Sequence, residues 1–155
     1  MMTLQTWQSH VSQWYESGQL HKIDNLIPLV HSPPEEIWGP SITDAQSKAI
    51  ACWLDGCLRI NRHYVHAGEA QKAYSYLNFA YAKLQSVSCH PLSEIDLKSW
   101  ALKRLEHLIV LILEQCSQQG WQQELHQQIE SHVQFMAKHN ELTVEHEVQT
   151  KKAAI

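Results

Sequence analysis

Hydrophobic residues recur along most of this chain at intervals of three and four, the spacing of one face of an α-helix. The first such stripe is Leu4, Trp7, Val11 and Trp14. No segment alternates apolar and polar residues in the way a half-buried strand does. The pattern therefore predicts an all-α protein of about six helices, in the stretches 3–16, 20–30, 41–67, 70–88, 93–119 and 121–140.

Particular residues indicate where these helices begin and end. Pro28 has no amide donor and should kink or end the second helix. Ser41 and Ser93, each with an aspartate three residues later, are typical of capping boxes and should begin the third and fifth helices. Asn140 should end the sixth helix, so that residues 141–155 form a short helix or a disordered tail.

Three of the five glycines share one local frame. Each stands four positions after an apolar residue and five before the next one; the three are Gly18, Gly68 and Gly120. Glycine readily adopts the left-handed backbone that ends a helix, so each frame predicts an αα-hairpin. We therefore expect three hairpins, arranged as a helical repeat or as an orthogonal bundle.

The middle frame is similar to the second half of a tetratricopeptide repeat. It matches that family's spacing at Tyr64, Gly68, Ala73, Leu77 and Ala80. It departs from the family at Cys57 and Asn61, where Trp and Gly are usual, and the glycines recur at 50 and 52 residues rather than at the family's roughly 34. The resemblance implies a concave surface that binds a protein or peptide.

A length of 155 residues suits one domain. We expect residues 1–140 to form it, with residues 31–41 as the linker between the first and second hairpins, because the Pro-Pro and Gly-Pro pairs there cannot continue a helix. The start has no basic segment followed by an apolar one, and the apolar run 108–113 is far too short to span a membrane. These features predict a cytoplasmic protein without a membrane segment, with its four cysteines reduced.

The charge balance narrows the choice of partners. Twelve Lys and Arg stand against sixteen Asp and Glu, a formal charge of −4, which argues against nucleic-acid binding through a broad basic surface. Protonation of all eleven histidines would bring the charge to +7. Sensitivity of solubility or oligomeric state to mild acid is therefore a hypothesis.

Motifs for catalysis are missing from the chain. His63 and His66 share a helix face and His90 could add a third imidazole, but surface histidines near a helix end are the simpler interpretation. Cys89 and His90 are the one adjacent Cys/His pair, and neighbours in a loop rarely reach the geometry that activates a thiol. We therefore predict no catalytic residue, metal or cofactor, although an enzyme is not excluded.

The aromatic residues suggest a surface for a protein partner. Tyr74 and Tyr81 stand seven apart on the fourth helix, so they project together, either as an exposed surface or beneath the sixth helix or the linker. Trp38 either pins the linker to the core or anchors a partner. With Arg62 and Lys72 nearby, these residues predict a non-enzymatic protein-interaction module: an adaptor, regulator or assembly chaperone.

Two alternatives stay open. A pocket between the hairpins, with His63, His66 and Asp55 as its polar groups, would make the chain a small-ligand-binding protein or an enzyme. The glutamine-rich stretch 115–128 carries few charges and is most simply solvent-exposed, but it also suits pairing with a second copy of the chain.

Overall fold

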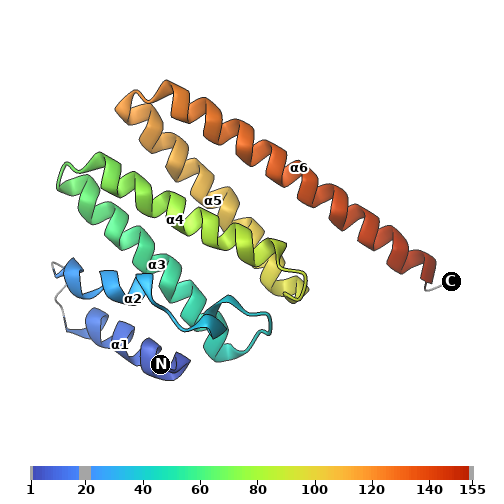
Figure 1. Cartoon of the computed structure of the whole chain (residues 1–155), viewed down its shortest axis with the longest axis horizontal. Helices are drawn as coiled ribbons and strands as arrows, with labels where there is room; N and C mark the ends of the chain where they lie inside the picture. Colours follow the sequence, from blue (N-terminus) through green and yellow to red (C-terminus); the bar gives the residue numbers. More distant parts are fainter. Residues whose placement is uncertain (1, 18–21, 154–155) are drawn as a thin grey trace. The chain divides into compact units, whose positions relative to one another are not determined.

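The computed structural model describes residues 2–17 and 22–153, with side chains as far as His139. Within these residues the chain forms six α-helices and no strand, which confirms the all-α prediction (Figure 1). The helices are α1 (Leu4–Glu16), α2 (Ile27–His31), α3 (Asp44–His66), α4 (Ala70–Cys89), α5 (Ile95–Gln119) and α6 (Gln122–Ala153). The chain divides within α5 into an N-terminal part, residues 1–108, and a C-terminal part, residues 109–155.

Helix α1 begins where the sequence predicts. The Thr3 side chain accepts a hydrogen bond from the Thr6 amide at 3.2 Å, which satisfies one of the unpaired donors at the helix start. The predicted apolar stripe is buried: Leu4, Trp7, Val11 and Trp14. Gly18, which was expected to end this helix, lies outside the described residues.

The segment between α1 and α3 is held by tryptophan side chains. It contains 3₁₀ turns at Ile23–Asn25 and Glu35–Trp38 on either side of the short α2. The indole N–H groups of Trp14, Trp7 and Trp53 donate to the carbonyls of Lys22, Leu29 and Val30 at 3.0, 2.8 and 2.9 Å. Because short helices leave many carbonyls unpaired, these bonds both satisfy the backbone and anchor the segment.

Three predicted helix boundaries were wrong in detail. Pro28 lies in the first turn of α2, where its missing N–H costs nothing, so it helps to begin that helix. Thr43, not Ser41, caps α3 by accepting from the Gln46 amide at 3.0 Å. The Ser93 hydroxyl donates to the Val87 carbonyl at 3.0 Å, and α5 begins two residues later.

Helices α3 and α4 lie side by side (Figure 1). The stripe predicted for α4 is buried, and two of its members are alanines that allow a close approach: Ala73, Leu77, Ala80 and Leu84. The Asn61 amide donates to the Ala73 carbonyl at 2.6 Å and joins the two helices. On another side of α3, a β-carbon at Gly56 would lie 2.9 Å from Val30 Cγ2, so glycine there lets α2 approach.

The turn between α3 and α4 explains the spacing of the glycine frame. Gly68 has φ 75° and Glu69 donates its amide to the Tyr64 carbonyl at 2.9 Å, while Gly68 donates to Val65 at 3.1 Å. These two bonds define a Schellman turn, which requires a left-handed residue at the glycine position. The carbonyl oxygen that closes the turn belongs to Tyr64, the residue four positions before the glycine.

The C-terminal part contains the same turn at Gly120. Gly120 has φ 73°, Trp121 donates its amide to the Cys116 carbonyl at 2.9 Å and Gly120 donates to Ser117 at 3.2 Å. Helix α6 then continues through Asn140, so the predicted end at that residue was wrong; asparagine costs a helix interior only a few tenths of a kcal/mol. Among residues 122–139 no side chain of α6 is buried, and Ile129 of the predicted stripe is 39% exposed.

Candidate functional site

A recess lined by basic side chains lies in the N-terminal part. Its volume is about 290 Å³, and among the described residues its lining is Trp14, Ile23, Arg59, Arg62, His63 and His66. The four basic residues stand at positions i, i+3, i+4 and i+7 of α3, which places them on one face of the helix. Trp14 of α1 and Ile23 of the first 3₁₀ turn supply an apolar wall. We call this site the basic recess.

Arg59 is held in the basic recess by a polar cluster with α1. Its Nε donates to Asp55 Oδ2 at 2.9 Å, the Tyr15 hydroxyl donates to the same oxygen, and the guanidinium lies 4.7 Å from the centre of the Tyr15 ring. Burial acts to raise the pKa of Asp55, but the hydrogen bonds from Tyr15 and Arg59 outweigh it and leave that pKa below its ordinary value. The Asp55–Arg59 pair is therefore ionised at neutral pH.

The other basic side chains of the recess have fewer protein partners. Arg62 Nε donates to the Leu58 carbonyl at 3.3 Å, and the His63 ring meets the edge of Tyr64 at 5.3 Å. The ion pairs found in the described part of the chain are Arg59–Asp55 and Lys72–Glu69. Arg62 thus keeps its charge without a carboxylate partner from those residues.

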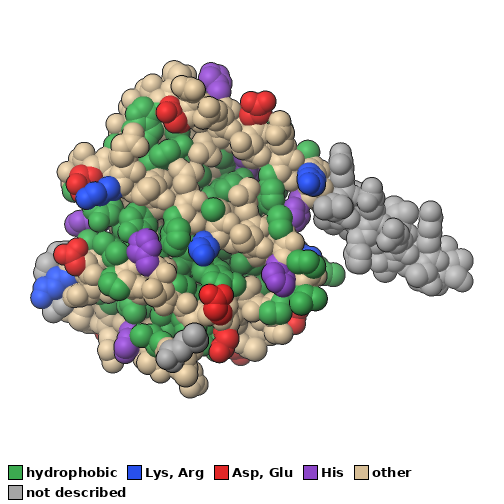
Figure 2. All heavy atoms as spheres, in the orientation of Figure 1, with side chains coloured by type: hydrophobic (Ala, Val, Ile, Leu, Met, Phe, Trp, Pro, Cys, Tyr) green, Lys and Arg blue, Asp and Glu red, His purple; other side chains and the backbone are tan. Residues whose placement is uncertain are grey.

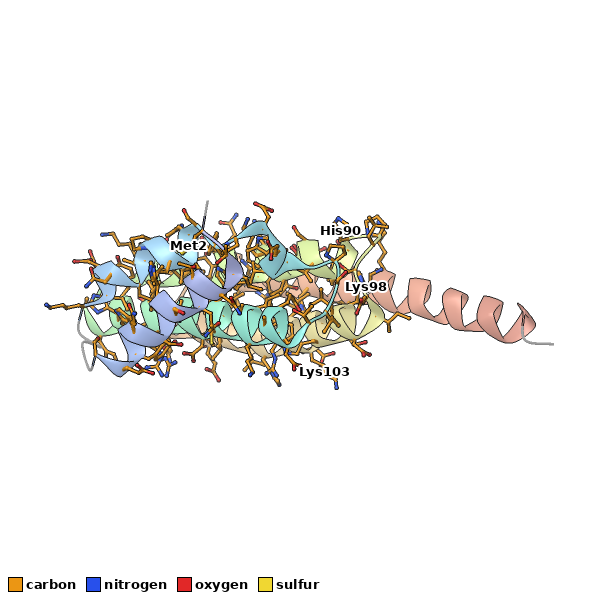
Figure 3. The ribbon with its side chains drawn as sticks, turned by 90° about the horizontal axis from the view of Figure 1, so that it is seen from below. Met2, His90, Lys98 and Lys103 are labelled. Atoms are coloured by element: carbon orange, nitrogen blue, oxygen red, sulfur yellow. The ribbon has the colours of Figure 1, made fainter. Side chains whose placement is uncertain are left out.

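A second recess lies at the end of the N-terminal part where α4 turns into α5. Its volume is about 190 Å³, and its described lining is Glu35, Trp38, Lys83, Ser86, Val87 and His90. The Leu92 amide donates to His90 Nδ1 at 3.1 Å, and Figure 3 shows His90 at this turn. The Glu94 amide donates to the Pro40 carbonyl at 3.1 Å, which ties the turn to the linker. We call this site the loop-end recess.

Two exposed apolar residues follow His90 in the turn from α4 to α5. Leu92 is 73% exposed and Ile95 is 69% exposed. Trp38 packs edge-on against Trp53, with ring centres 4.7 Å apart, and the Lys83 amino group lies 5.4 Å from the Trp38 ring centre. Trp38 is half-buried, so it pins the linker to the core and still lines the recess.

The predicted contact residues do not form one surface. Trp38 lines the loop-end recess, whereas Arg62 lines the basic recess. Lys72 pairs with Glu69 at 3.4 Å and lies 5.4 Å from the centre of the Tyr64 ring. The residues were grouped by helix position, but the two recesses are formed by different neighbouring segments.

The tyrosines of α4 differ from the exposed pair that the spacing suggested. Tyr74 is half-buried, and Tyr81 is buried with 8% of its surface exposed. Burial raises the pKa of Tyr81 to about 12, because the phenolate is poorly solvated there. The residue turns into the interior, so an exposed surface built on both rings is a wrong prediction.

The histidines and cysteines singled out in the sequence do not lie together at one site either. His63 and His66 meet in the basic recess, while His90 lines the other one. No group of three His, Cys, Asp or Glu side chains able to hold a metal ion occurs in the described part of the chain. Burial raises the pKa of the Cys57 thiol, and Cys89 beside His90 is exposed.

Some residues of both recesses were not predicted as functional. Arg59 could have been found from its helical spacing to Arg62, His63 and His66, which is visible in the sequence. Lys83 gave no such signal, because the loop-end recess brings together segments about fifty residues apart. On the face of the molecule drawn in Figure 2, Lys and Arg side chains are few and lie apart from one another.

No protein-family model, curated protein or solved structure matches this chain. No helix in the described residues is long and apolar enough to cross a membrane. The two recesses are therefore the features from which a function can be inferred.

Proposed function

We propose that this protein is a non-enzymatic protein-interaction module, and that its partner docks at the loop-end recess. The occupant is a segment of another protein that presents an apolar side chain next to a carboxylate. The apolar group covers Leu92 and Ile95, and the carboxylate approaches Lys83. Adaptor, regulator and assembly chaperone all belong to this class.

The exposure of Leu92 and Ile95 is the observation that carries the proposal. Single exposed apolar residues are ordinary, but these two come two and five residues after His90, which lines a recess with a tryptophan on its wall. Tryptophan in a partly desolvated recess is typical of residues that dominate binding energy at interfaces. The recess itself combines Trp38 and Val87 with four polar side chains, those of Glu35, Lys83, Ser86 and His90.

The charges at the recess favour an acidic neighbour for the apolar group. Lys83 is exposed and takes part in neither ion pair found among the described residues. It lies over the rings of Trp38 and Phe79, at 5.4 and 6.0 Å from their centres. Glu35, which also lines the recess, would repel a second carboxylate of the bound segment. This repulsion restricts how the segment can be oriented.

The similarity of residues 64–80 to a tetratricopeptide repeat is in keeping with this class of function. That similarity implies binding of proteins or peptides. The similarity says nothing about where the partner docks; the proposed position at the loop end is supported by the exposed side chains alone.

A peptide library displayed on phage tests the proposal. Selection on the wild-type protein should enrich sequences with an apolar residue next to Asp or Glu. The double variant Leu92→Ser/Ile95→Ser should bind the enriched peptides at least tenfold more weakly, and Lys83→Gln severalfold more weakly. Val65→Ser is the matched control, because Val65 is an exposed apolar residue near the C-terminal end of α3 and does not line the loop-end recess.

Two outcomes would overturn the proposal. One is a selection that enriches no common motif on the wild-type protein. The other is equal binding of the enriched peptides to the wild type and to the double variant. Far-ultraviolet circular dichroism of each variant checks that the fold is retained.

A further inference from the structure

The basic recess gathers four nitrogen-bearing side chains along two turns of α3. These are Arg59, Arg62, His63 and His66, and the eight residues from 59 to 66 cover about 10 Å of helix. Guanidinium groups match the oxygens of phosphate and carboxylate, and imidazoles add further N–H donors. A volume of about 290 Å³ is at the small end of ligand sites, so the recess suits a small group.

The acidic groups nearest the recess do not cancel its charge. Asp55 shares its carboxylate between Arg59 and the Tyr15 hydroxyl, so it orients one guanidinium; it attracts Arg62 electrostatically but forms no ion pair with it. Glu69, just beyond the end of α3, pairs with Lys72. On the lining and in direct contact with it, the two guanidinium groups of Arg59 and Arg62 thus stand against the one carboxylate of Asp55.

The end of α3 would ordinarily repel an anion, because the last carbonyls of a helix carry partial negative charge. Here the turn at Gly68 engages those carbonyls. His63, Tyr64 and Val65 accept amides from Ala67, Glu69 and Gly68 at 3.0, 2.9 and 3.1 Å. The oxygens bound in this way repel an anion less than free ones would.

The wall of the recess is apolar rather than polar. The Trp14 indole N–H is engaged by the Lys22 carbonyl at 3.0 Å, and Trp14 and Ile23, 6% and 5% exposed, present only a narrow apolar edge to the recess. An inorganic anion would not use this wall. A phosphate attached to a small aromatic or aliphatic group would use both the basic face and the wall.

We propose that the basic recess is a binding site for an organic phosphate, separate from the loop-end recess. Arg62 contacts the phosphate oxygens, Arg59 supports them from a position held by Asp55, and His63 and His66 donate N–H groups. Trp14 and Ile23 cover the organic part of the ligand. This site goes beyond the proposed protein interaction and does not depend on it.

Isothermal titration calorimetry with phenyl phosphate tests this site, with inorganic phosphate and phenol as companion probes. We expect phenyl phosphate to bind with a millimolar or tighter Kd, inorganic phosphate more weakly, and phenol not measurably. Arg62→Gln should weaken phenyl phosphate binding about tenfold, because it removes charge-assisted hydrogen bonds. His63→Gln/His66→Gln should weaken it severalfold.

The control is Lys48→Gln, which makes the same charge change at an exposed position near the start of α3. It should leave binding unchanged, and so should Lys83→Gln in the loop-end recess. Absence of binding to the wild type would overturn the proposal, as would equal weakening by Lys48→Gln and Arg62→Gln. Phenol binding as tightly as phenyl phosphate would also overturn it, because the wall alone would then account for the affinity.

Discussion

The turns at Gly68 and Gly120 have the same hydrogen bonds, yet the helices that follow them differ in burial. After Gly68, Ala73, Leu77 and Ala80 are all at most 2% exposed. The corresponding residues after Gly120 are Leu125, Ile129 and His132, which are half-buried or exposed. The turn therefore determines that a helix reverses direction, but it does not determine how much of the next helix becomes buried.

The difference between the two hairpins lies in the side chains away from the turn. Helix α4 offers two alanines to α3, and Asn61 of α3 bonds to the Ala73 carbonyl. At the position of Asn61, three residues before the residue that closes the turn, the second frame has Leu113. Small residues and a buried amide thus give the α3–α4 hairpin a closely fitted contact that the sequence of the second frame does not repeat.

The largest expected effect comes from truncating the same frame position in the two helices. Leu77→Ala should lower the free energy of unfolding by about 2–5 kcal/mol, because it leaves a cavity in a fully packed site. Ile129→Ala should cost less than about 1 kcal/mol, because Ile129 is already partly in water. Urea denaturation followed by circular dichroism measures both, and equal losses would contradict the contrast in burial.

The glycines themselves should respond alike. Gly68→Ala and Gly120→Ala should each cost about 1–2 kcal/mol, the penalty of a left-handed backbone for a residue with a β-carbon. A β-carbon would meet nothing within 4 Å at either position, so no clash adds to the cost. Asparagine at the same positions should recover part of the loss. A difference of several kcal/mol between the two alanine variants, in the same urea experiment, would show that the turns are not equivalent.

The smallest effect concerns the polar cluster of Tyr15, Asp55 and Arg59, which joins α1 to α3. This cluster gives the α3–α4 hairpin a contact with another helix in addition to its own turn. Because the folded pKa of Asp55 is below its ordinary value of 3.8, its contribution is present above that value and is lost as the pH falls through the folded pKa. Asp55→Asn should therefore cost less than about 1 kcal/mol at neutral pH, since the carboxylate is 44% exposed.

The comparison for Asp55 is the urea midpoint of wild type and variant at about pH 7 and about pH 3. The difference between the urea midpoints of wild type and variant should become smaller on acidification, because the wild-type carboxylate is protonated. Tyr15→Phe provides a control that removes one hydrogen bond but retains the Arg59 ion pair. A difference between the two urea midpoints that stays constant or widens at low pH would contradict the stabilising role of the ionised Asp55 carboxylate.

Much of the fold followed from local patterns, and the misplaced features show where such patterns stop. The apolar stripe of α1, the frame residues of α4 and the turns at Gly68 and Gly120 were predicted because they depend on residues within one or two helical turns of each other. The cap at Thr43 was missed because a nearby serine had the better motif. Whether Tyr81 is exposed or packed beneath another segment stayed open, because helical spacing gives a side of the helix without saying what packs there.

The candidate sites were predicted only in part for the same reason. His63 and His66 were recognised as sharing a face, and Trp38 as a residue of the linker. Their neighbours Trp14, Ile23 and Lys83 come from segments far away in the chain. Periodicity cannot place such residues, because it compares positions only within one element.

The amino-acid sequence by itself determined the helices and the glycine turns, since backbone hydrogen bonds and the left-handed glycine conformation involve residues only a few positions apart. The tertiary structure alone decided which stripe is buried, which basic side chains face the wall of Trp14 and Ile23, and which apolar residues stay in water at the loop end. Those properties depend on packing between segments tens of residues apart, where side-chain volume and the satisfaction of buried polar groups select the arrangement.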